Sequence, residues 1–81
     1  MTLTERIQRL AEAAYVYEFM ADNIMSDHEF DQESLAVEID FHKEGVPDPI
    51  LSSFMKTYFS PSTGMWIYNY PYKEGLDQKY G

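Results

Sequence analysis

Two aromatic and two acidic side chains form the part of this sequence best suited to binding a small ligand: Tyr17, Asp27, Phe30 and Asp31. Aromatic faces attract flat, positively charged rings by stacking and by cation–π interaction. Carboxylates accept hydrogen bonds from hydroxyl and amide groups. Asp27 and Asp31 are four residues apart, so both point to the same side of a helix, and Glu38 follows seven residues further on that side. One interpretation is therefore a binding site for a small ligand.

The same region also has a purely structural interpretation. Aromatic side chains at helical spacing more often belong to a core than to a ligand site. The aromatic side chains concerned are Tyr15, Tyr17, Phe19 and Phe30. Ser26 and Glu29 have the spacing of a capping box, and Asp27 falls in the first helical turn, where the helix dipole favours a negative charge. Both interpretations are open at the level of the sequence.

The order of these residues resembles a domain of known function. Residues 14–31 read AYVYEFMADNIMSDHEFD. This segment resembles the small N-terminal domain, called Ia, of NAD-dependent DNA ligases, where an aromatic Y-x-Y-[YH] helix end precedes D-x-P-x-I-[SP]-D-x-E-Y-D. The resemblance implies a helical domain that binds NAD or nicotinamide mononucleotide, with Tyr17, Asp27, Phe30 and Asp31 in contact with the ligand. It also suggests a stand-alone version of this domain, of the kind that a phage or prophage encodes.

The segment differs from the family pattern at three points. Glu18 stands where the family has a histidine or tyrosine, Phe30 stands where it has a tyrosine, and the connector lacks the usual proline. Phenylalanine keeps the aromatic face but loses the phenol hydroxyl, and a glutamate repels a phosphate. The resemblance therefore implies recognition of the nicotinamide ring more than of the phosphate.

No catalytic residue and no metal site are expected. A DNA ligase needs a nucleophilic lysine in a K-x-D-G sequence, whereas Lys73 and Lys79 lie in KEG and KYG. The chain has no Gly-rich phosphate loop and no Ser-His-Asp or Cys-His pattern. His28 and His42 have carboxylates near them, but neither group has the spacing of a metal-binding motif. We therefore expect a non-catalytic module and not an enzyme.

Composition restricts the partners of this chain. It has 81 residues, no cysteine, and 14 acidic against 6 basic residues, for a net charge of −8. Proteins that bind nucleic acid directly need lysine and arginine to neutralise phosphates, so we expect no such binding. An alternative function is an acidic interaction or inhibitor protein, again of a phage type, that acts on a basic protein partner. A third is a structural accessory of a larger assembly.

No segment has the long apolar run of a signal peptide or a membrane span. A cytoplasmic protein without membrane contact is therefore expected.

Helix signals predict an all-α fold in a single domain over residues 1–81. Capping boxes begin at Thr2 and Ser26, and Asp48-Pro49 has the pattern of an N-cap followed by proline. The three helices are expected at residues 3–21, 27–43 and 49–59. The first two should form an antiparallel hairpin over about residues 3–43.

The C-terminal part should close the core. Met65 to Tyr70 (MWIYNY) is aromatic and β-branched, which predicts an extended segment. We expect Trp66 and Ile67 to fold back as a lid, so that the third helix and this strap cover about residues 48–72. The tail, residues 73–81, should form at most one weak helical turn.

Overall fold

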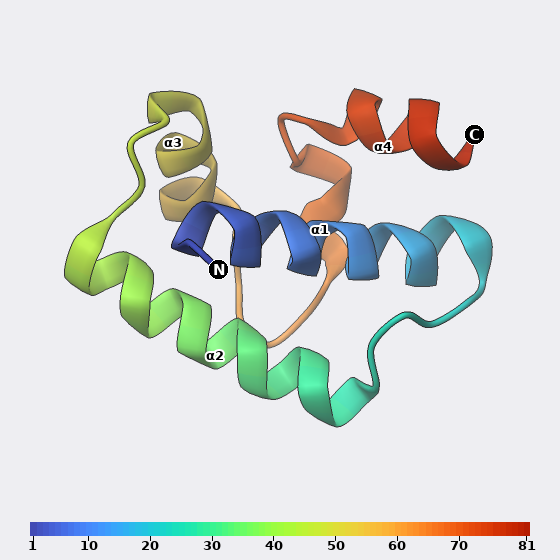
Figure 1. Cartoon of the computed structure of the whole chain (residues 1–81), viewed down its shortest axis with the longest axis horizontal. Coiled ribbons are helices and arrows are strands. Elements are labelled where there is room, and N and C mark those ends of the chain that lie inside the picture. Colours follow the sequence, from blue (N-terminus) through green and yellow to red (C-terminus); the bar gives the residue numbers. More distant parts are fainter.

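The computed structural model describes residues 1–81 and contains helices but no strand. Its elements are α1 (Leu3–Met20), α2 (Asp27–Glu44), α3 (Pro49–Thr57), the 3-10 helix η1 (Met65–Asn69) and α4 (Lys73–Tyr80). α1 crosses the middle of the molecule, with α2 on one side and α3 and α4 on the other (Figure 1). The expected all-α class is confirmed.

α1 begins at a capping box and ends at a residue in the left-handed conformation. The Thr2 hydroxyl accepts a hydrogen bond from the N–H of Glu5 at 3.2 Å, and the Glu5 carboxylate accepts one from the N–H of Thr2 at 2.9 Å. At the other end Ala21 has φ 53° and ψ 41°, and its N–H donates to the carbonyl of Val16. This conformation costs an L-residue with a Cβ about 1–2 kcal/mol. It lies where the chain turns out of α1 towards α2.

α2 runs back along α1, which confirms the predicted antiparallel hairpin (Figure 1). The Ser26 hydroxyl caps α2 by accepting a backbone N–H of the first turn at 3.1 Å. Gly45 follows its last turn with φ 66° and ψ −172°, a conformation open almost only to glycine. Arg6 of α1 joins the two helices, because its Nε donates to Glu33 at 2.7 Å and its Nη1 to Asp40 at 2.6 Å.

α3 starts where the sequence predicts and ends slightly earlier than expected. The Asp48 carboxylate accepts the backbone N–H groups of Ile50 at 2.9 Å and Leu51 at 3.4 Å. It also accepts a hydrogen bond from the hydroxyl of Tyr72, so the cap of α3 is tied to the segment before α4. The last helical residue is Thr57.

The extended aromatic segment predicted for residues 65–70 is wrong. Met65–Asn69 forms η1, in which the N–H of Ile67 donates to the carbonyl of Gly64 at 3.1 Å. Trp66 and Ile67 are 3% and 0% exposed. Consecutive side chains of a strand point to opposite faces, and no other strand is present to bond its backbone. A 3-10 turn buries both neighbours and satisfies its own backbone groups. The predicted role of Trp66 and Ile67 as a lid on the core is confirmed.

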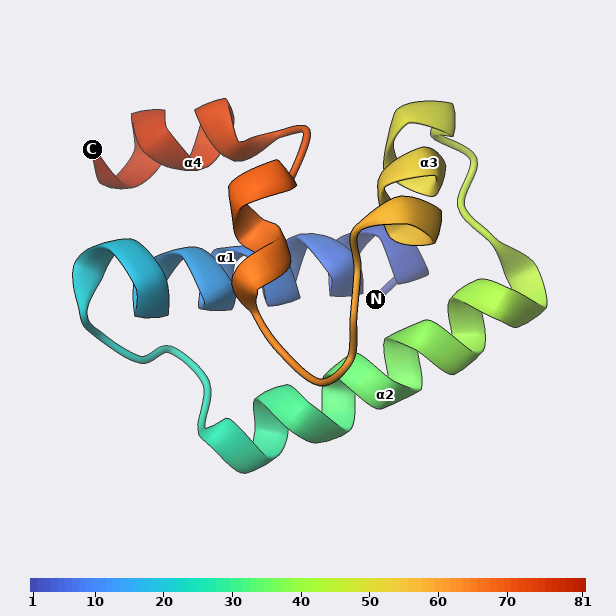
Figure 2. The same cartoon turned by 180° about the vertical axis from the view of Figure 1, so that it is seen from behind.

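The core surrounds α1 on more than one side. Figure 2 shows η1 lying across α1, on the side away from the viewer in Figure 1. The buried core consists of Leu3, Ile7, Leu10, Ala11, Ala14, Tyr15, Val37, Phe41, Leu51, Phe54, Met55, Trp66, Ile67 and Tyr70. By contrast, Leu35 and Ile39 on the outer face of α2 are 53% and 54% exposed. None of the helices combines the length and the apolar character that crossing a membrane requires.

α4 is attached to α1 by side-chain hydrogen bonds, and none of its residues is buried. The Tyr15 hydroxyl donates to Asp77 at 2.7 Å, and the Tyr80 hydroxyl donates to Glu12 at 2.6 Å. Lys79 adds an ion pair with Glu12 at 3.0 Å. These partners are separated by at least 62 residues. The expectations of three helices and of at most one weak helical turn in residues 73–81 are therefore wrong, because α4 is a fourth helix of 8 residues. A helix of this length is marginal by itself, so its order depends on these distant partners.

Acidification is expected to release α4 before the rest of the chain unfolds. The hydrogen bond from Tyr15 lowers the pKa of Asp77 below its ordinary value of 3.8, and that from Tyr80 lowers the pKa of Glu12 below 4.5. A carboxyl group whose pKa is lower in the folded than in the unfolded chain stabilises the folded state at pH values above its unfolded pKa. This stabilisation is lost as the pH falls through the pKa of the folded state. NMR ring signals of Tyr80 should therefore change below about pH 4.5, before those of Trp66.

The double variant Glu12→Gln and Asp77→Asn is the matched control. It keeps the side-chain sizes but removes both titrating groups, so its Tyr80 signals should not respond to acid in this range. If the signals of Tyr80 and Trp66 in the unaltered chain change together at one pH, α4 does not open separately.

Candidate functional site

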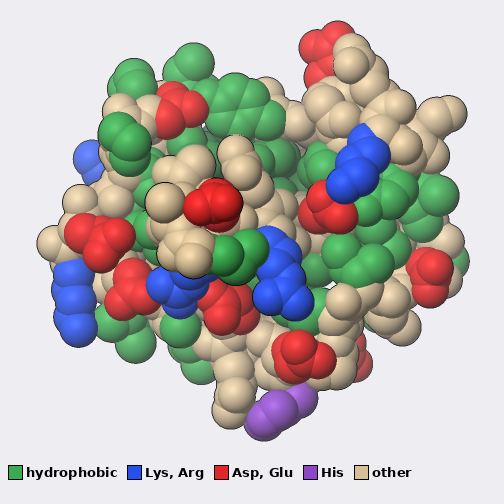
Figure 3. Space-filling view, in the orientation of Figure 1, with side chains coloured by type: hydrophobic (Ala, Val, Ile, Leu, Met, Phe, Trp, Pro, Cys, Tyr) green, Lys and Arg blue, Asp and Glu red, His purple; other side chains and the backbone are tan.

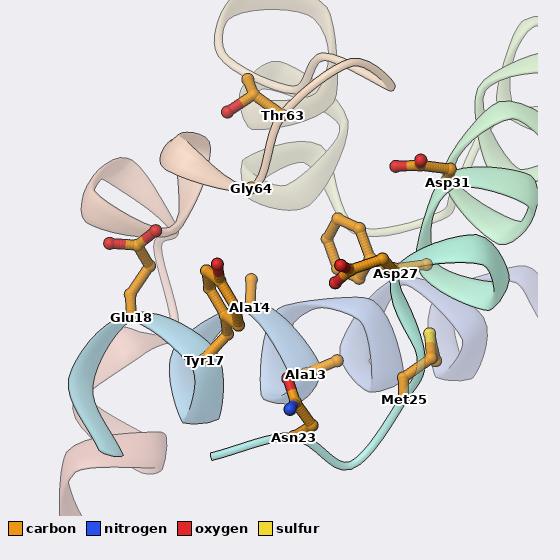
Figure 4. Close-up of a pocket in the computed structure, with 11 residues that line it drawn as sticks. Ala13, Ala14, Tyr17, Glu18, Asn23, Met25, Asp27, Asp31, Thr63 and Gly64 are labelled. Atoms are coloured by element: carbon orange, nitrogen blue, oxygen red, sulfur yellow. The ribbon is translucent and has the colours of Figure 1, made fainter. Parts of the chain in front are cut away.

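A hollow lies between the second half of α1 and the first turns of α2. Its volume is about 350 Å³, at the lower end of small-molecule pockets. It is lined by Ala13, Ala14, Tyr17, Glu18, Asn23, Met25, Asp27, Phe30, Asp31, Thr63 and Gly64 (Figure 4). All four residues proposed from the sequence as ligand contacts are among them. We call this hollow the α1–α2 pocket.

α1 supplies one wall with a small surface and one large ring. Ala13 and Ala14 form the part nearest the core, and their methyl groups leave space that larger side chains would fill. Tyr17 is one helical turn beyond Ala14 and therefore lies on the same face. Its side chain is 59% exposed, and its hydroxyl has no hydrogen-bond partner in the chain. The Tyr17 ring is thus available to a ligand and is not part of the core.

α2 supplies the opposite wall with one ring and two carboxylates. Asp27, Phe30 and Asp31 share a helix face because they are three and four residues apart. The carboxylates of Asp27 and Asp31 both project away from α2, and that of Asp27 extends towards α1 (Figure 4). Neither accepts a hydrogen bond from the protein, whereas Glu33 and Asp40 on the same helix are held by Arg6. Phe30 is partly buried and packs against the core.

The third wall comes from the connector between α3 and η1, which sequence reasoning missed. Thr63 and Gly64 lie against the gap between the two helices (Figure 4). A Cβ atom built on Gly64 would be 3.5 Å from both Ala14 Cβ and Phe30 Cζ. The turn composition of residues 60–64 predicts a loop but carries no signal of what that loop covers.

The other aromatic side chains of the segment lie away from the pocket. Tyr15 is 5% exposed, and its ring is 4.8 Å from that of Phe19 and 5.8 Å from that of Tyr80, measured between centroids. The structural interpretation is therefore confirmed for Tyr15, whereas Tyr17 is exposed. Glu38, which the helical spacing placed on the side of Asp31, is not part of the pocket lining.

Glu18 lines the rim of the pocket and is tied to η1. Its carboxylate accepts a hydrogen bond from the Tyr68 hydroxyl at 3.2 Å. Partial burial, followed by this hydrogen bond, raises the pKa of Tyr68 above its ordinary value. No lysine, arginine or histidine lines the pocket. A ligand therefore meets carboxylates and aromatic faces there, with no cationic side chain.

The other acidic and basic side chains form ion pairs but no candidate metal site. No group of three or more His, Cys, Asp or Glu side chains is placed to hold a metal ion. Lys73 forms an ion pair with Asp77 at 3.1 Å, and Lys79 forms one with Glu12 at 3.0 Å.

Comparisons with protein-family models, with curated proteins and with solved structures found no match to this chain. The resemblance to the ligase domain thus depends on residues 14–31 themselves.

Proposed function

We propose that this chain is a non-catalytic module that binds nicotinamide mononucleotide, or the same half of NAD, in the α1–α2 pocket. One observation carries the proposal. Tyr17, Asp27, Phe30 and Asp31, which the ligase resemblance implies as ligand contacts, come from two helices and line one hollow of about 350 Å³.

The chemistry of the lining supports the same class of ligand. No other ring stacks on Tyr17 or Phe30. Tyr17 is exposed, whereas Phe30 is partly buried against the core and lines the pocket with the rest of its ring. Such faces suit a pyridinium ring. The free carboxylates of Asp27 and Asp31 suit ribose hydroxyls and the carboxamide N–H groups. A pocket of this size holds the ring and ribose, with the adenosine half of NAD outside it.

The other expected function, docking to a basic protein, has less support. On the face shown in Figure 3 the acidic side chains lie among basic and apolar ones and form no continuous patch. Several carboxylates are already paired, with Arg6, Lys73 or Lys79. Leu35 and Ile39 do form an exposed apolar stretch of α2, but nothing in the structure shows what covers it.

Nicotinamide mononucleotide at millimolar concentration is expected to shift the NMR resonances of Tyr17, Asp27, Phe30 and Asp31, whereas AMP should not. Asp31→Ala should weaken binding by about 1–3 kcal/mol, the usual effect of losing a hydrogen bond to a charged group. Phe30→Tyr, which restores a hydroxyl, should leave binding unchanged or strengthen it. Two-dimensional spectra of the isotope-labelled chain provide the measurement.

Glu38→Ala is the matched control for Asp31→Ala. Both remove an unpaired carboxylate from α2, but only Asp31 lines the pocket, so Glu38→Ala should bind normally. If all four pocket residues are unaffected by millimolar nicotinamide mononucleotide, the proposed function is wrong.

A further inference from the structure

The charges around the α1–α2 pocket have one sign. Glu18, Asp27 and Asp31 line it, and no basic side chain does. Arg6 is occupied by Glu33 and Asp40. Arg9, one helical turn before Ala13, lines the neighbouring hollow beside Glu29 and Glu33 and is not part of this pocket. An anionic group entering this pocket would meet three carboxylates without a counter-charge, and a cationic group would meet all three favourably.

Helix ends do not reverse this sign. The N-terminus of α2 borders the pocket and carries about half a positive charge. Asp27 and Glu29 lie in this first turn and offset that charge. The C-terminal end of α1, which carries the opposite partial charge, also borders the pocket through Tyr17 and Glu18. The carboxylates therefore dominate the local potential.

The aromatic side chains add a preference for a flat cation. The face of an aromatic ring carries partial negative charge, so Tyr17 and Phe30 attract a positively charged ring more than a neutral ring of the same size. A reduced nicotinamide ring is neutral, so it loses the cation–π attraction and the attraction to the carboxylates. Free nicotinamide is flat but neutral, so neither the aromatic rings nor the carboxylates attract it by charge.

We infer that the α1–α2 pocket selects the oxidised, positively charged pyridinium ring and disfavours a phosphate, so that its preferred ligands are unphosphorylated pyridinium nucleosides such as nicotinamide riboside. This inference rests on the proposed function and specifies it. Within the nicotinamide ligands, the riboside binds best because it keeps the ring charge and the hydroxyl groups without adding negative charge. The mononucleotide still binds, with its phosphate directed out of the pocket.

The test compares four ligands on the full chain by NMR titration at low salt: nicotinamide riboside, its reduced form, nicotinamide and nicotinamide mononucleotide. We expect the riboside to bind about tenfold more tightly than the mononucleotide, a difference that corresponds to about 1.4 kcal/mol. The reduced riboside and nicotinamide should be weaker by a similar factor. Added salt should reduce the difference between riboside and mononucleotide, because it screens exposed charges.

Variants without the pocket carboxylates test whether these charges cause the preference for the riboside. Asp27→Asn combined with Asp31→Asn keeps the size of both side chains and should weaken riboside binding while bringing the affinity for the mononucleotide close to that for the riboside. Glu38→Gln, a carboxylate of α2 outside the pocket, should leave the ratio unchanged. Circular dichroism establishes that each variant is folded before its affinity is compared.

The outcomes separate this inference from the proposed function. If the mononucleotide binds as tightly as the riboside at low salt, or the reduced riboside as tightly as the oxidised one, the selection for charge is wrong and nicotinamide binding stands. If no nicotinamide ligand affects the pocket residues, both proposals are overturned.

Discussion

Trp66→Ala is expected to lower the free energy of unfolding by about 3–5 kcal/mol, the usual cost of removing a large aromatic side chain from a core. Trp66 is 3% exposed, and its ring lies 5.3 Å from that of Phe59 and 5.8 Å from that of Phe54, measured between centroids. Small domains have only about 5–15 kcal/mol of stability, so this variant should be close to unfolding. Urea denaturation followed by far-UV circular dichroism measures the change without depending on tryptophan fluorescence.

Two variants serve as controls for Trp66→Ala. Met65→Ala changes the preceding residue of η1, which is 55% exposed, and should have little effect. Trp66→Phe should cost less than Trp66→Ala, because it keeps an aromatic ring and removes the indole N–H, which is buried without an acceptor. Equal stability of Trp66→Ala and the unaltered chain would show that η1 does not close the core.

Leu10→Ala is expected to destabilise the chain by about 2–5 kcal/mol, since it removes a buried leucine and leaves a cavity. Leu10 is 0% exposed and lies on α1, which packs against both α2 and η1. The loss of stability should therefore affect the whole domain. It should appear as a single unfolding transition at a lower temperature and a lower urea concentration. Differential scanning calorimetry and urea denaturation both report it.

Leu35→Ala provides the matched comparison for Leu10→Ala. The chemical change is identical, but Leu35 is 53% exposed on the outer face of α2, so its replacement should alter stability only slightly. A large loss for Leu35→Ala would mean that this face of α2 is covered in solution, and would direct attention to a partner or a second copy there.

The parts of the fold that could be predicted from the sequence are those controlled by local chemistry. Thr2, Ser26 and Asp48 each accept backbone N–H groups within the next three residues, so their side chains identify a helix start without knowledge of the rest of the molecule. Gly45 ends α2 for a similarly local reason. The hairpin followed from these boundaries and from the apolar spacing within each helix.

The parts that could not be predicted depend on distant partners. Residues 65–70 have strand-like composition, but burial of both Trp66 and Ile67 beside α1 outweighed that preference. The order of α4 depends on Tyr15 and Glu12, which its own sequence does not reveal. Both errors have the same cause, because tertiary packing decides the conformation of short segments with weak intrinsic preferences.

The candidate pocket also contains residues that could be predicted from the sequence and residues that could not. Helical spacing puts Asp27 and Asp31 on one face, whereas Tyr17 and Phe30 were expected as ligand contacts because the ligase resemblance implies them. The ligase resemblance implies Tyr17 and not Tyr15 as a ligand contact, and Tyr15 lies in the core. Thr63 and Gly64 could not be predicted, since their position depends on the path of the connector after α3.

The position of Gly64 beside Ala14 and Phe30 has a consequence for the order in which the α1–α2 pocket forms during synthesis of the chain. A chain emerging from the ribosome folds its N-terminal part first, and the α1–α2 hairpin needs only contacts that are already available at that stage. Gly64, which forms a wall of this pocket, follows Phe30 by 34 residues and Ala14 by 50. A nascent hairpin therefore presents Tyr17 and Asp27 without an enclosed pocket. The proposed binding of a nicotinamide ligand would therefore begin only after the connector between α3 and η1 has left the exit tunnel.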